Sequence, residues 1–379
     1  MTRWINAELA TLNRITQNHR VQHNPVPEIN AVGVFYLNVD IKPNKLKIVF
    51  YCNDTLENIQ SMEYYNQDIQ VLIESGHDVK VCNKYSDIPL NFDVIFIWWW
   101  TYALYPALLA KLLGRKSIIT GVFNYKAVEH MPNSGFHGRP FHQRLLIKLA
   151  LMMTDVNLFV SKIEYDEIPS VFKLKKFHYF PCAIADMYFQ KTGESPREGV
   201  LNISWSGKEN LQRKGVLDIL DALRILKDRG IHIYCSLAGR PGNGYPELLA
   251  HISHLGLESQ VVTLGEVSLD KKLTLFAGAK IYLQPSYFEG FGLATAEALA
   301  SGCCIIACDV GEVKNVLGDG AYYVTPGNHL ELANVIEKLL SDSDLMSELV
   351  AKGQKRLSEL YSQKNKKDSL NIILDQLRK

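Results

Sequence analysis

The stretch Pro285-Ser-Tyr-Phe-Glu-Gly-Phe-Gly-Leu-Ala-Thr-Ala-Glu-Ala298 decides the fold. The apolar run before it, Ala279–Gln284, predicts a short buried strand, and its alanine-rich second part predicts a helix that stops at Gly302. The free N–H groups at the start of such a helix, together with the positive end of its dipole, bind anions, most often phosphate. The stretch therefore predicts a phosphate-binding strand, turn and helix, with Glu289 in the turn and Glu297 in the helix.

The order of the side chains along this stretch indicates what kind of ligand fits. Gly290 and Gly292 let a ligand approach the backbone closely. Glu289 can meet the part of a ligand just outside the helix, and Glu297, about one turn further along, can reach a hydroxyl beyond it. A ligand with a sugar at one end, phosphates in the middle and a ribose at the other end fits this order.

The same stretch resembles the Glu-x7-Glu signature of family 4 of the retaining glycosyltransferases, a group with the GT-B fold. Both glutamates, both glycines and Phe291 fall where the signature has them. The resemblance implies that Glu289 contacts the transferred sugar, that Glu297 holds the ribose of the nucleotide, and that the backbone N–H groups between them bind the diphosphate. The donor-binding set implied here is Gly290, Phe291, Gly292, Leu293, Ala294 and Glu297.

Length and composition fit a folded protein with room for two domains. The chain has 379 residues, of which 47% are hydrophobic and 21% charged. A formal net charge of +1 gives no general attraction to nucleic acid, so no nucleic-acid partner is expected. Its seven cysteines form no CxxC pair and are expected to be small core residues in a reducing compartment.

One apolar run, Val94–Ala110, approaches the length of a membrane span. Pro106 and the polar tips of Thr101 and two tyrosines divide it, so a strand, a loop and a helix are predicted instead. The N-terminus lacks the apolar region of a signal peptide. A soluble, cytoplasmic protein is therefore expected.

The alternation of apolar strands and amphipathic helices predicts an α/β protein with two Rossmann-like, doubly wound parallel-sheet domains in series. Residues 1–45 are expected to be an extension of unknown role, 46–189 an acceptor-binding domain and 190–200 a linker. Residues 201–360 are expected to bind the nucleotide sugar, and a helix over 361–379 to pack back toward the first domain. Two such domains facing each other across a cleft is the GT-B arrangement.

A charged turn, Gly207-Lys-Glu-Asn-Leu-Gln-Arg-Lys-Gly215, is predicted between a strand and a helix over 215–229. Cations at this edge of a parallel sheet lie where such folds bind ligands. The family has an arginine after the glycine and a lysine six positions later. Lys208 replaces that arginine, which keeps the charge but loses the bidentate fork, and Lys214 matches the lysine.

The resemblance implies that Lys214 neutralises the diphosphate as the nucleotide leaves, with Gly207 and Lys208 beside it. Arg213 is expected to point away or to make a secondary contact. The alternative is a solvated charged turn without a ligand.

Two further segments are assigned to the donor. The glycine-rich loop after a strand predicted over 231–236 contains Arg240, which could touch the diphosphate, although its glycines could equally only form a turn. The segment Gly265-Glu-Val267 resembles the part of the family that reads the nucleobase through main-chain atoms.

Two other motifs resemble a dinucleotide-binding site and a metal site. Gly290–Thr295 is one residue short of the dinucleotide fingerprint, but it does not follow the first strand of its unit, which argues against NAD. Asp342-Ser-Asp344 is the only Asp-x-Asp in the chain and is expected to cap a helix. No cofactor and no catalytic metal are therefore predicted.

The first domain departs from the family pattern. No glycine pair follows its first strand, and Asn124 lies near the position of the family's histidine. Asn124 can donate a hydrogen bond but cannot act as acid or base, and His130 is the nearest histidine downstream. These two residues are the acceptor-side candidates. In the second domain Asn315 stands where a glutamate follows the family's Gly-Gly pair.

The segment 135–153 combines three cations, Arg139, Arg144 and Lys148, with an apolar stripe. Such a helix could contact an anionic membrane or a lipid-linked acceptor at the inner face of the membrane. The favoured alternative is a helix whose apolar face packs on the sheet.

Together these features predict a retaining, metal-independent hexosyltransferase. Its donor is expected to be a nucleoside-diphosphate sugar, with UDP-glucose as an example, and its acceptor a carbohydrate or a lipid-linked saccharide in polysaccharide or glycoconjugate biosynthesis. Two alternatives stay open: a nucleotide-sugar epimerase of the same fold, and a non-catalytic sugar-nucleotide-binding protein.

Overall fold

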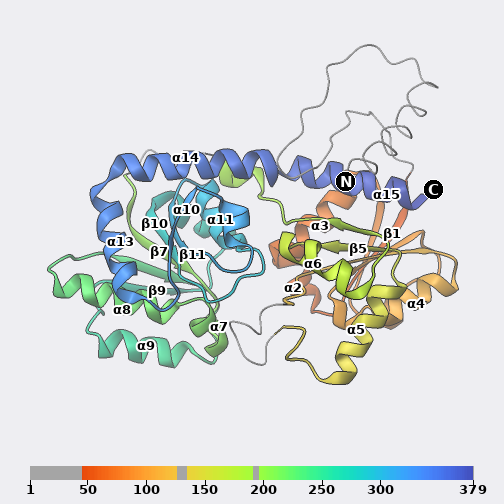
Figure 1. Cartoon of the computed structure of the whole chain (residues 1–379), viewed down its shortest axis with the longest axis horizontal. Helices are drawn as coiled ribbons and strands as arrows, with labels where there is room; N and C mark the ends of the chain where they lie inside the picture. The colour runs from red at the N-terminus through yellow and green to blue at the C-terminus, as the bar shows by residue number, and fades with distance from the viewer. Residues whose placement is uncertain (1–44, 126–134, 191–195, 379) are drawn as a thin grey trace, which may run out of the picture. The chain divides into compact units, whose positions relative to one another are not determined.

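The computed structural model describes residues 45–125, 135–190 and 196–378, and within them it contains two six-stranded parallel sheets (Figure 1). Apart from Lys45, the extension expected over residues 1–45 lies outside the described residues. His130 also lies outside them.

The first sheet has the strand order β2-β1-β3-β4-β5-β6. Its strands are β1 (Lys47–Cys52), β2 (Asp78–Cys82), β3 (Val94–Trp98), β4 (Lys116–Thr120), β5 (Val156–Phe159) and β6 (Phe177–Tyr179). The helices between them are α2 (Leu56–Ser61), α3 (Glu63–Glu74), α4 (Leu104–Leu112), α5 (Phe141–Met153) and α6 (Lys162–Phe172). All five residues of β3 are buried, as expected for a central parallel strand with helices on both faces of its sheet.

The second sheet has the order β12-β11-β10-β7-β8-β9. Its strands are β7 (Glu198–Ile203), β8 (Cys235–Ala238), β9 (Val261–Gly265), β10 (Ala279–Gln284), β11 (Cys304–Cys308) and β12 (Ala321–Val324). Its helices are α7 (Lys208–Arg213), α8 (Val216–Asp228), α9 (Tyr245–His254), α10 (Leu269–Gly278), α11 (Leu293–Ala300), α12 (Val313–Leu317), α13 (His329–Ser341) and α14 (Ser343–Leu360).

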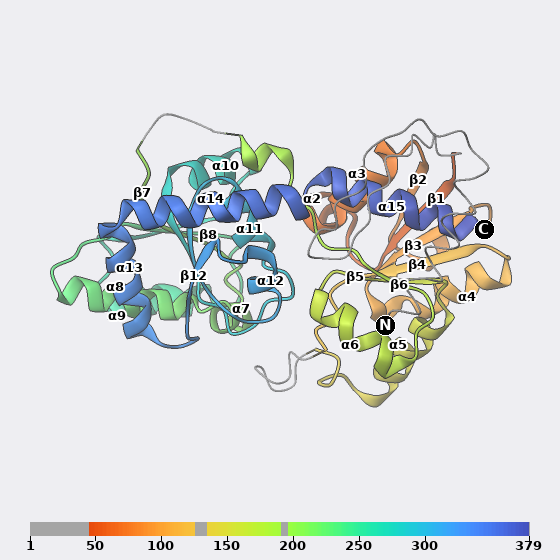
Figure 2. The ribbon, with the colours of Figure 1, turned by 45° about the horizontal axis from the view of Figure 1, so that its top comes forward.

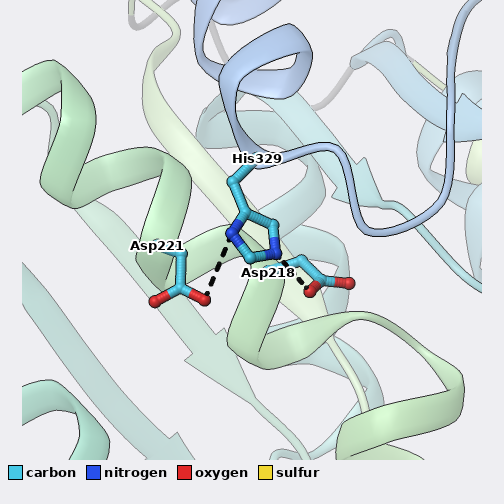
Figure 3. A group of neighbouring side chains, drawn as sticks. All are labelled: Asp218, Asp221 and His329. Carbon is cyan, nitrogen blue, oxygen red and sulfur yellow. Dashed lines mark hydrogen bonds and ion pairs between the residues drawn. The ribbon is translucent and has the colours of Figure 1, made fainter.

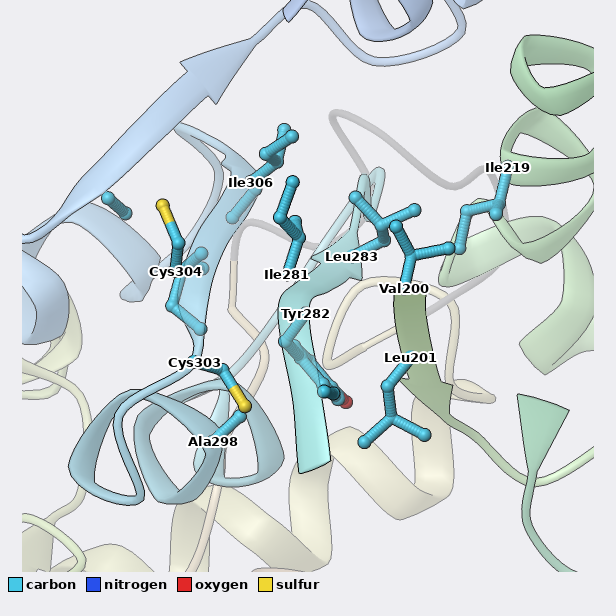
Figure 4. Packing of buried hydrophobic residues seen from close by; sticks show 14 of the residues in the cluster. Val200, Leu201, Ile219, Ile281, Tyr282, Leu283, Ala298, Cys303, Cys304 and Ile306 are labelled. Atoms are coloured by element: carbon cyan, nitrogen blue, oxygen red, sulfur yellow. The ribbon is translucent and has the colours of Figure 1, made fainter. Parts of the chain in front are cut away.

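The core of the second sheet consists of interleaved aliphatic side chains (Figure 4). Val200 of β7 lies beside Ile281 and Leu283 of β10, with Ile219 of α8 on the same side, whereas Leu201 points to the other face of the sheet with Tyr282. All seven cysteines of the chain are buried and free, which fits small core residues. The predicted parallel α/β architecture is confirmed.

The strand order also brings two loops together. β7 is hydrogen-bonded to both β8 and β10, so the direction of winding reverses between β7 and β10. The carboxyl ends of the two strands at such a switch point form a crevice that binds ligands in open α/β sheets. The segment 204–215 follows β7 and the segment 285–292 follows β10, so both reach this crevice.

Two local predictions were wrong. The segment predicted as a turn after Gly207 forms helix α7, and α8 then starts at Val216 after Gly215, whose φ of 62° suits glycine. The strand predicted over 231–236 begins only at Cys235. A separate short helix, α2, precedes α3, because the chain is extended at Met62 between them.

The last helix, α15 (Gln363–Arg378), packs on the first sheet beside α3 (Figure 2). Its apolar face lies in the same buried cluster as β1 and β3 and consists of Leu370, Ile373, Leu374 and Leu377. Lys366 of this helix forms an ion pair of 2.8 Å with Asp68 of α3, and both side chains are almost fully buried (4% and 1% exposed).

The apolar run Val94–Ala110 forms β3, a short 3-10 turn and the start of α4, as predicted. Among the described helices, none is both long and apolar enough to cross a membrane.

Candidate functional site

The stretch after β10 forms the predicted turn and helix. Gly292 precedes α11 with a φ of 82°, a conformation that glycine adopts without strain. No side chain caps the start of α11, so its first N–H groups are not bonded by an N-cap side chain. This helix start lies at the switch point of the second sheet, as a site for an anionic ligand requires.

Glu289 lies buried in this turn, with its side chain 9% exposed. Its Oε1 accepts hydrogen bonds from Lys214 Nζ at 2.9 Å, Gln284 Nε2 at 2.7 Å and Ser286 Oγ at 3.1 Å. Burial raises the pKa of Glu289, but the charges of Lys214 and Arg213 and the hydrogen bonds outweigh it and lower the pKa to about 2. Glu289 is therefore ionised at neutral pH.

Arg213 contributes to the same cluster. One of its guanidinium nitrogens lies 3.4 Å from Glu289 Oε1 and donates to the carbonyl oxygen of Phe288 at 3.0 Å. Of the two alternatives expected for Arg213, the structure shows the secondary contact, and the side chain does not point away. The reason is helix α7, which sequence reasoning treated as a turn: its C-terminal end presents Arg213 and Lys214 together to the Glu289 turn.

Glu297 lies on the buried face of α11 and is 1% exposed. Its Oε2 pairs with Lys272 Nζ of α10 at 2.6 Å, and Lys272 also donates to the hydroxyl of Tyr188 at 3.1 Å. Glu297 Oε1 is buried and has no hydrogen-bond partner among the described residues. Sequence reasoning missed Lys272, because no motif marks it and only the packing of α10 beside α11 brings it there.

A pocket of about 420 Å³ adjoins this turn. Lys214 and the backbone from Glu289 to Ala294 line it from the second sheet, and Asn124 lines it from the first sheet. Three aromatic side chains, Tyr64, Trp98 and Trp99, also line it from this half, together with Val122 and Cys182. The structure thus brings Asn124 together with most of the predicted donor set.

The two sides of this pocket touch at Gly290. A Cβ atom at Gly290 would lie 2.3 Å from Cγ1 of Val122 and 3.3 Å from Oδ1 of Asn124, so only glycine leaves room for the loop after β4. Asn124 itself has a left-handed backbone with a φ of 56°, and its Oδ1 is buried without a partner among the described residues.

Four other predicted residues lie outside this cluster. Lys208 is exposed at the first position of α7 and lines a different pocket with Tyr287, and Gly207 is the residue before it. Arg240 is exposed after β8, and Val267 is half-buried after β9. Among the described residues, no side chain of these four contacts Glu289 or Lys214.

A group of metal-ligating side chains lies elsewhere in the second half (Figure 3). His329 Nε2 lies 2.9 Å from Asp218 Oδ1, and His329 Nδ1 lies 3.5 Å from Asp221 Oδ2. The ring thus lies between the two carboxylates with one nitrogen toward each. Asp221 Oδ1 also pairs with His251 Nε2 at 2.9 Å, while Asp218 Oδ2 is buried without a hydrogen-bond partner among the described residues. The imidazole of His329 joins α8 to the start of α13.

Solved structures with the same arrangement of sheets include sucrose-phosphate synthase from Thermosynechococcus elongatus, with a TM-score of 0.69 over 87% of this chain and 99% of that one, at 16% identity. Alr3699/HepE from Anabaena, solved in complex with UDP, has a TM-score of 0.68 over 87% of this chain and 100% of its own, at 18% identity. The fold is GT-B.

The family-model match lies in the half that carries Glu289. Residues 205–356 match the family model "Glycosyl transferases group 1". MMP alpha-(1->4)-mannosyltransferase of Mycolicibacterium hassiacum is 32% identical over 54% of this chain and 50% of its own length. Phosphatidyl-myo-inositol mannosyltransferase of Mycolicibacterium smegmatis is 26% identical over 66% of this chain and 63% of its own length. The matched region therefore spans 50% and 63% of the length of these two curated relatives.

Proposed function

We propose that the protein is a retaining glycosyltransferase of family 4, which transfers a hexose from a nucleoside-diphosphate sugar to a hydroxyl of a saccharide or lipid-linked saccharide. The observation that carries this proposal is the ionised Glu289, held between Lys214 and Arg213 beside the uncapped start of α11. Anionic phosphates are the ligands that two cations and a helix N-terminus attract. The similarity of residues 205–356 to glycosyl transferases supports the same conclusion.

The donor is proposed to lie along the turn and α11. Its diphosphate binds the N–H groups before α11 with Lys214, and its ribose donates a hydroxyl hydrogen bond to Glu297. The buried, unpartnered Oε1 of Glu297 supports this role, since a buried acceptor without a donor costs free energy. UDP is the favoured nucleotide, because the similar HepE structure holds UDP.

The chemistry follows from the charges of the site. When the bond between the anomeric carbon and the phosphate oxygen breaks, negative charge grows on the phosphate, and Lys214 and Arg213 stabilise it. With a pKa of about 2, Glu289 stays a carboxylate, so it stabilises the positive charge at the anomeric carbon and donates no proton. These cations supply the charge for leaving-group stabilisation that a metal ion supplies in other enzymes, which supports metal independence.

We propose a front-face transfer. The acceptor hydroxyl approaches on the side from which the phosphate leaves, its oxygen bonds to the anomeric carbon, and its proton passes to the departing phosphate oxygen. The anomeric configuration is thereby retained. Asn124 is suited to hold the acceptor by hydrogen bonds, because it lines the pocket from the first sheet.

A contact of α5 with an anionic membrane also belongs to this proposal. The expectation that this helix buries its apolar face was only partly correct, because its buried residues are Ile147, Ala150 and Leu151. Five large apolar side chains of α5 are exposed: Phe141, Leu145, Leu146, Leu149 and Met152 (72%, 44%, 40%, 38% and 62%). The helix carries Arg144 and Lys148 and no acidic residue. Exposed apolar and basic side chains on one helix suit the surface of an anionic bilayer, where a lipid-linked acceptor lies.

The test is calorimetric titration of the purified chain with UDP, GDP and ADP, with and without Mn²⁺, followed by assays with the matching sugar nucleotides. We expect one nucleotide to bind selectively without metal and Glu297→Ala to weaken it about tenfold, the value of one or two lost hydrogen bonds. Glu337→Ala, an exposed helical glutamate of the same half, is the matched control and is expected to leave binding unchanged.

Each other result leads to a different conclusion. Absence of nucleotide binding in all conditions would overturn the proposal and favour a non-catalytic protein. Nucleotide binding followed by release of an altered sugar nucleotide without any acceptor would identify an epimerase. A product of inverted anomeric configuration would contradict the front-face mechanism.

A further inference from the structure

Glu312, which follows β11, forms a polar contact with the first half of the protein. It is 1% exposed, and its Oε1 accepts hydrogen bonds from Ser161 Oγ and from the backbone N of Ile163, both at 2.8 Å. Ser161 is the N-cap of α6. A carboxylate at the N-terminus of a helix satisfies free N–H groups and interacts favourably with the helix dipole. Glu312 therefore holds the start of a helix that belongs to the other sheet.

On the side of the first sheet, Glu164 continues this contact. Its backbone N donates to Ser161 Oγ at 3.1 Å, and its carboxylate accepts from the backbone N atoms of Phe123 at 3.1 Å and Tyr125 at 3.2 Å. These two residues flank Asn124, the pocket residue with the left-handed backbone. The position of the Asn124 loop thus depends on Glu164 and on the start of α6.

On the side of the second sheet, Glu312 is fixed to the Glu289 turn. Its backbone N donates to the carbonyl oxygen of Glu289 at 3.2 Å. A Cβ atom at Gly311 would lie 1.9 Å from that same oxygen, so a glycine is needed for this approach. The contacts form a closed circuit, because the Asn124 loop in turn meets the Glu289 turn at Gly290.

The chemistry of this circuit suits a contact that can open and close. No cation pairs with Glu164 or Glu312 among the described residues, and the donors are backbone N–H groups and a hydroxyl. If the two halves separate, water can solvate all of these groups, so the contact exchanges one set of hydrogen bonds for another. An apolar interface of the same size would instead expose apolar surface to water on opening, which costs free energy.

We propose that Glu312 is a positioning residue that docks α6, and with it the Asn124 loop, onto the Glu289 turn. It thereby sets the place of the acceptor relative to the donor sugar without touching either substrate. This inference rests on the proposed transferase function, but the docking itself can be measured without any substrate. In the sequence, Glu312 follows Gly311 and lies three residues before Asn315, the position at which this chain departs from the family pattern.

The first experiment is hydrogen exchange of the full chain, followed by mass spectrometry, for the wild type, Glu312→Ala and Glu312→Gln. In Glu312→Ala, the amide of Ile163 loses its acceptor, so peptides covering 160–165 and 122–125 are expected to exchange at least about tenfold faster. Glu312→Gln keeps an oxygen that can accept both bonds and is expected to restore much of the protection. Asp342→Ala is the matched control, because Asp342 caps α14 far from this contact in the chain.

The second experiment separates positioning from donor binding. In Glu312→Ala the nucleotide dissociation constant is expected to stay within about twofold of the wild type, because no nucleotide contact is proposed for Glu312. Acceptor kcat/KM in the transferase assay is expected to fall about tenfold or more, while the donor KM stays unchanged.

Unchanged exchange of the 160–165 peptide in Glu312→Ala would overturn the inference, whatever the enzyme assay shows. A loss of nucleotide affinity equal to the loss of acceptor kcat/KM would also overturn it, since a general structural role would then suffice. If Glu312→Ala fails to fold, Ser161→Ala tests the same contact from the other half. Faster exchange without any nucleotide binding would keep the docking contact and reject the transferase proposal.

Discussion

Glu289 and Glu164 line the same pocket of about 290 Å³ from opposite halves of the protein, and both are buried. Their pKa values are nevertheless shifted in opposite directions. Burial is the main cause that raises the pKa of Glu164 to about 7, and the charge of Glu312 raises it as well. Hydrogen bonds from the backbone of residues 123–125 lower this pKa but do not outweigh burial. Lys214 and Arg213 overcome the same burial at Glu289 and lower its pKa to about 2.

Because both carboxylates are buried, the comparison shows that their different partners account for the opposite directions of the two pKa shifts. At Asp68 burial raises the pKa although Lys366 opposes it, so a cation does not outweigh burial at every site. The half with the cations carries a permanent negative charge next to the proposed sugar site. The other half carries a carboxylate that titrates near neutral pH and is bound by backbone N–H groups. The first arrangement suits electrostatic stabilisation, and the second suits the positioning of a loop.

The largest expected effect concerns a third buried carboxylate, Asp68, whose cation comes from α15. Lys366→Met would leave Asp68 buried without its cation, and the loss of one partner of a buried pair costs roughly 3–5 kcal/mol of unfolding free energy. Urea unfolding checks this prediction. Lys367→Met, whose exposed side chain lies 3.7 Å from Glu74, is the control and is expected to change little. If Lys366→Met leaves the unfolding free energy unchanged, the partner cation contributes less to the stability of a buried carboxylate than the comparison implies.

The pH dependence of Glu164 is the next largest effect. Because its pKa is raised on folding, its contribution to stability is fully present below about pH 4.5 and is lost as the pH rises through about 7. Glu164→Gln lacks this titration, so the stability of the wild type relative to the variant is expected to fall by roughly 3 kcal/mol between pH 4.5 and 8. Unfolding free energies across this range measure it.

Glu312→Gln sharpens the same test, since it removes a charge that raises the pKa of Glu164. The pKa of Glu164 in the folded state is then lower, so the loss of stability with pH is expected to be smaller and to be complete at a lower pH. A stability difference between wild type and Glu164→Gln that does not vary with pH would contradict the assignment.

The third prediction concerns the cations of Glu289. Lys214→Ala is expected to lower kcat/KM of the proposed transferase by roughly 2–3 kcal/mol, or about 30- to 150-fold, the value of a hydrogen bond to a charged group. Steady-state kinetics with the sugar nucleotide identified by calorimetry measure this loss. Lys208→Ala provides the matched comparison, because Lys208 has the place of a family cation in sequence but lies outside the Glu289 cluster. Unchanged turnover in Lys214→Ala would remove the central support for the proposed site.

The smallest expected effect extends the comparison to the surfaces of the two halves. Leu145→Ser combined with Leu149→Ser is expected to weaken binding to vesicles of phosphatidylcholine and phosphatidylglycerol about tenfold, with little change in unfolding free energy, because both side chains are exposed. Co-sedimentation at low and high salt measures the binding. Leu330→Ser on α13, whose side chain is 55% exposed, is the control from the other half. Equal loss in the control, or no vesicle binding by the wild type, would reject the membrane contact.

The sequence predicted the features that depend on neighbouring residues. Short apolar runs between amphipathic segments predicted a doubly wound parallel protein, because buried parallel strands are apolar on both faces. The Glu289–Glu297 stretch was recognisable because its turn, helix start and two carboxylates all lie within one local unit. Lys214 was assigned because its spacing from Gly207 matches the family's lysine, and the structure adds that its segment follows β7, the strand beside β10.

Tertiary structure alone decided the contacts between distant segments. Lys272 reaches Glu297 because α10 packs beside α11, Lys366 reaches Asp68 from the end of the chain, and Glu312 reaches Ser161 of the other sheet. Ser161 caps α6 by accepting from the backbone N of Glu164, but the Glu164 carboxylate bonds to the loop after β4, which no local pattern indicates. Local patterns determine how a segment folds, but the side chain that satisfies a buried charge depends on which segments the packing of the whole chain brings together.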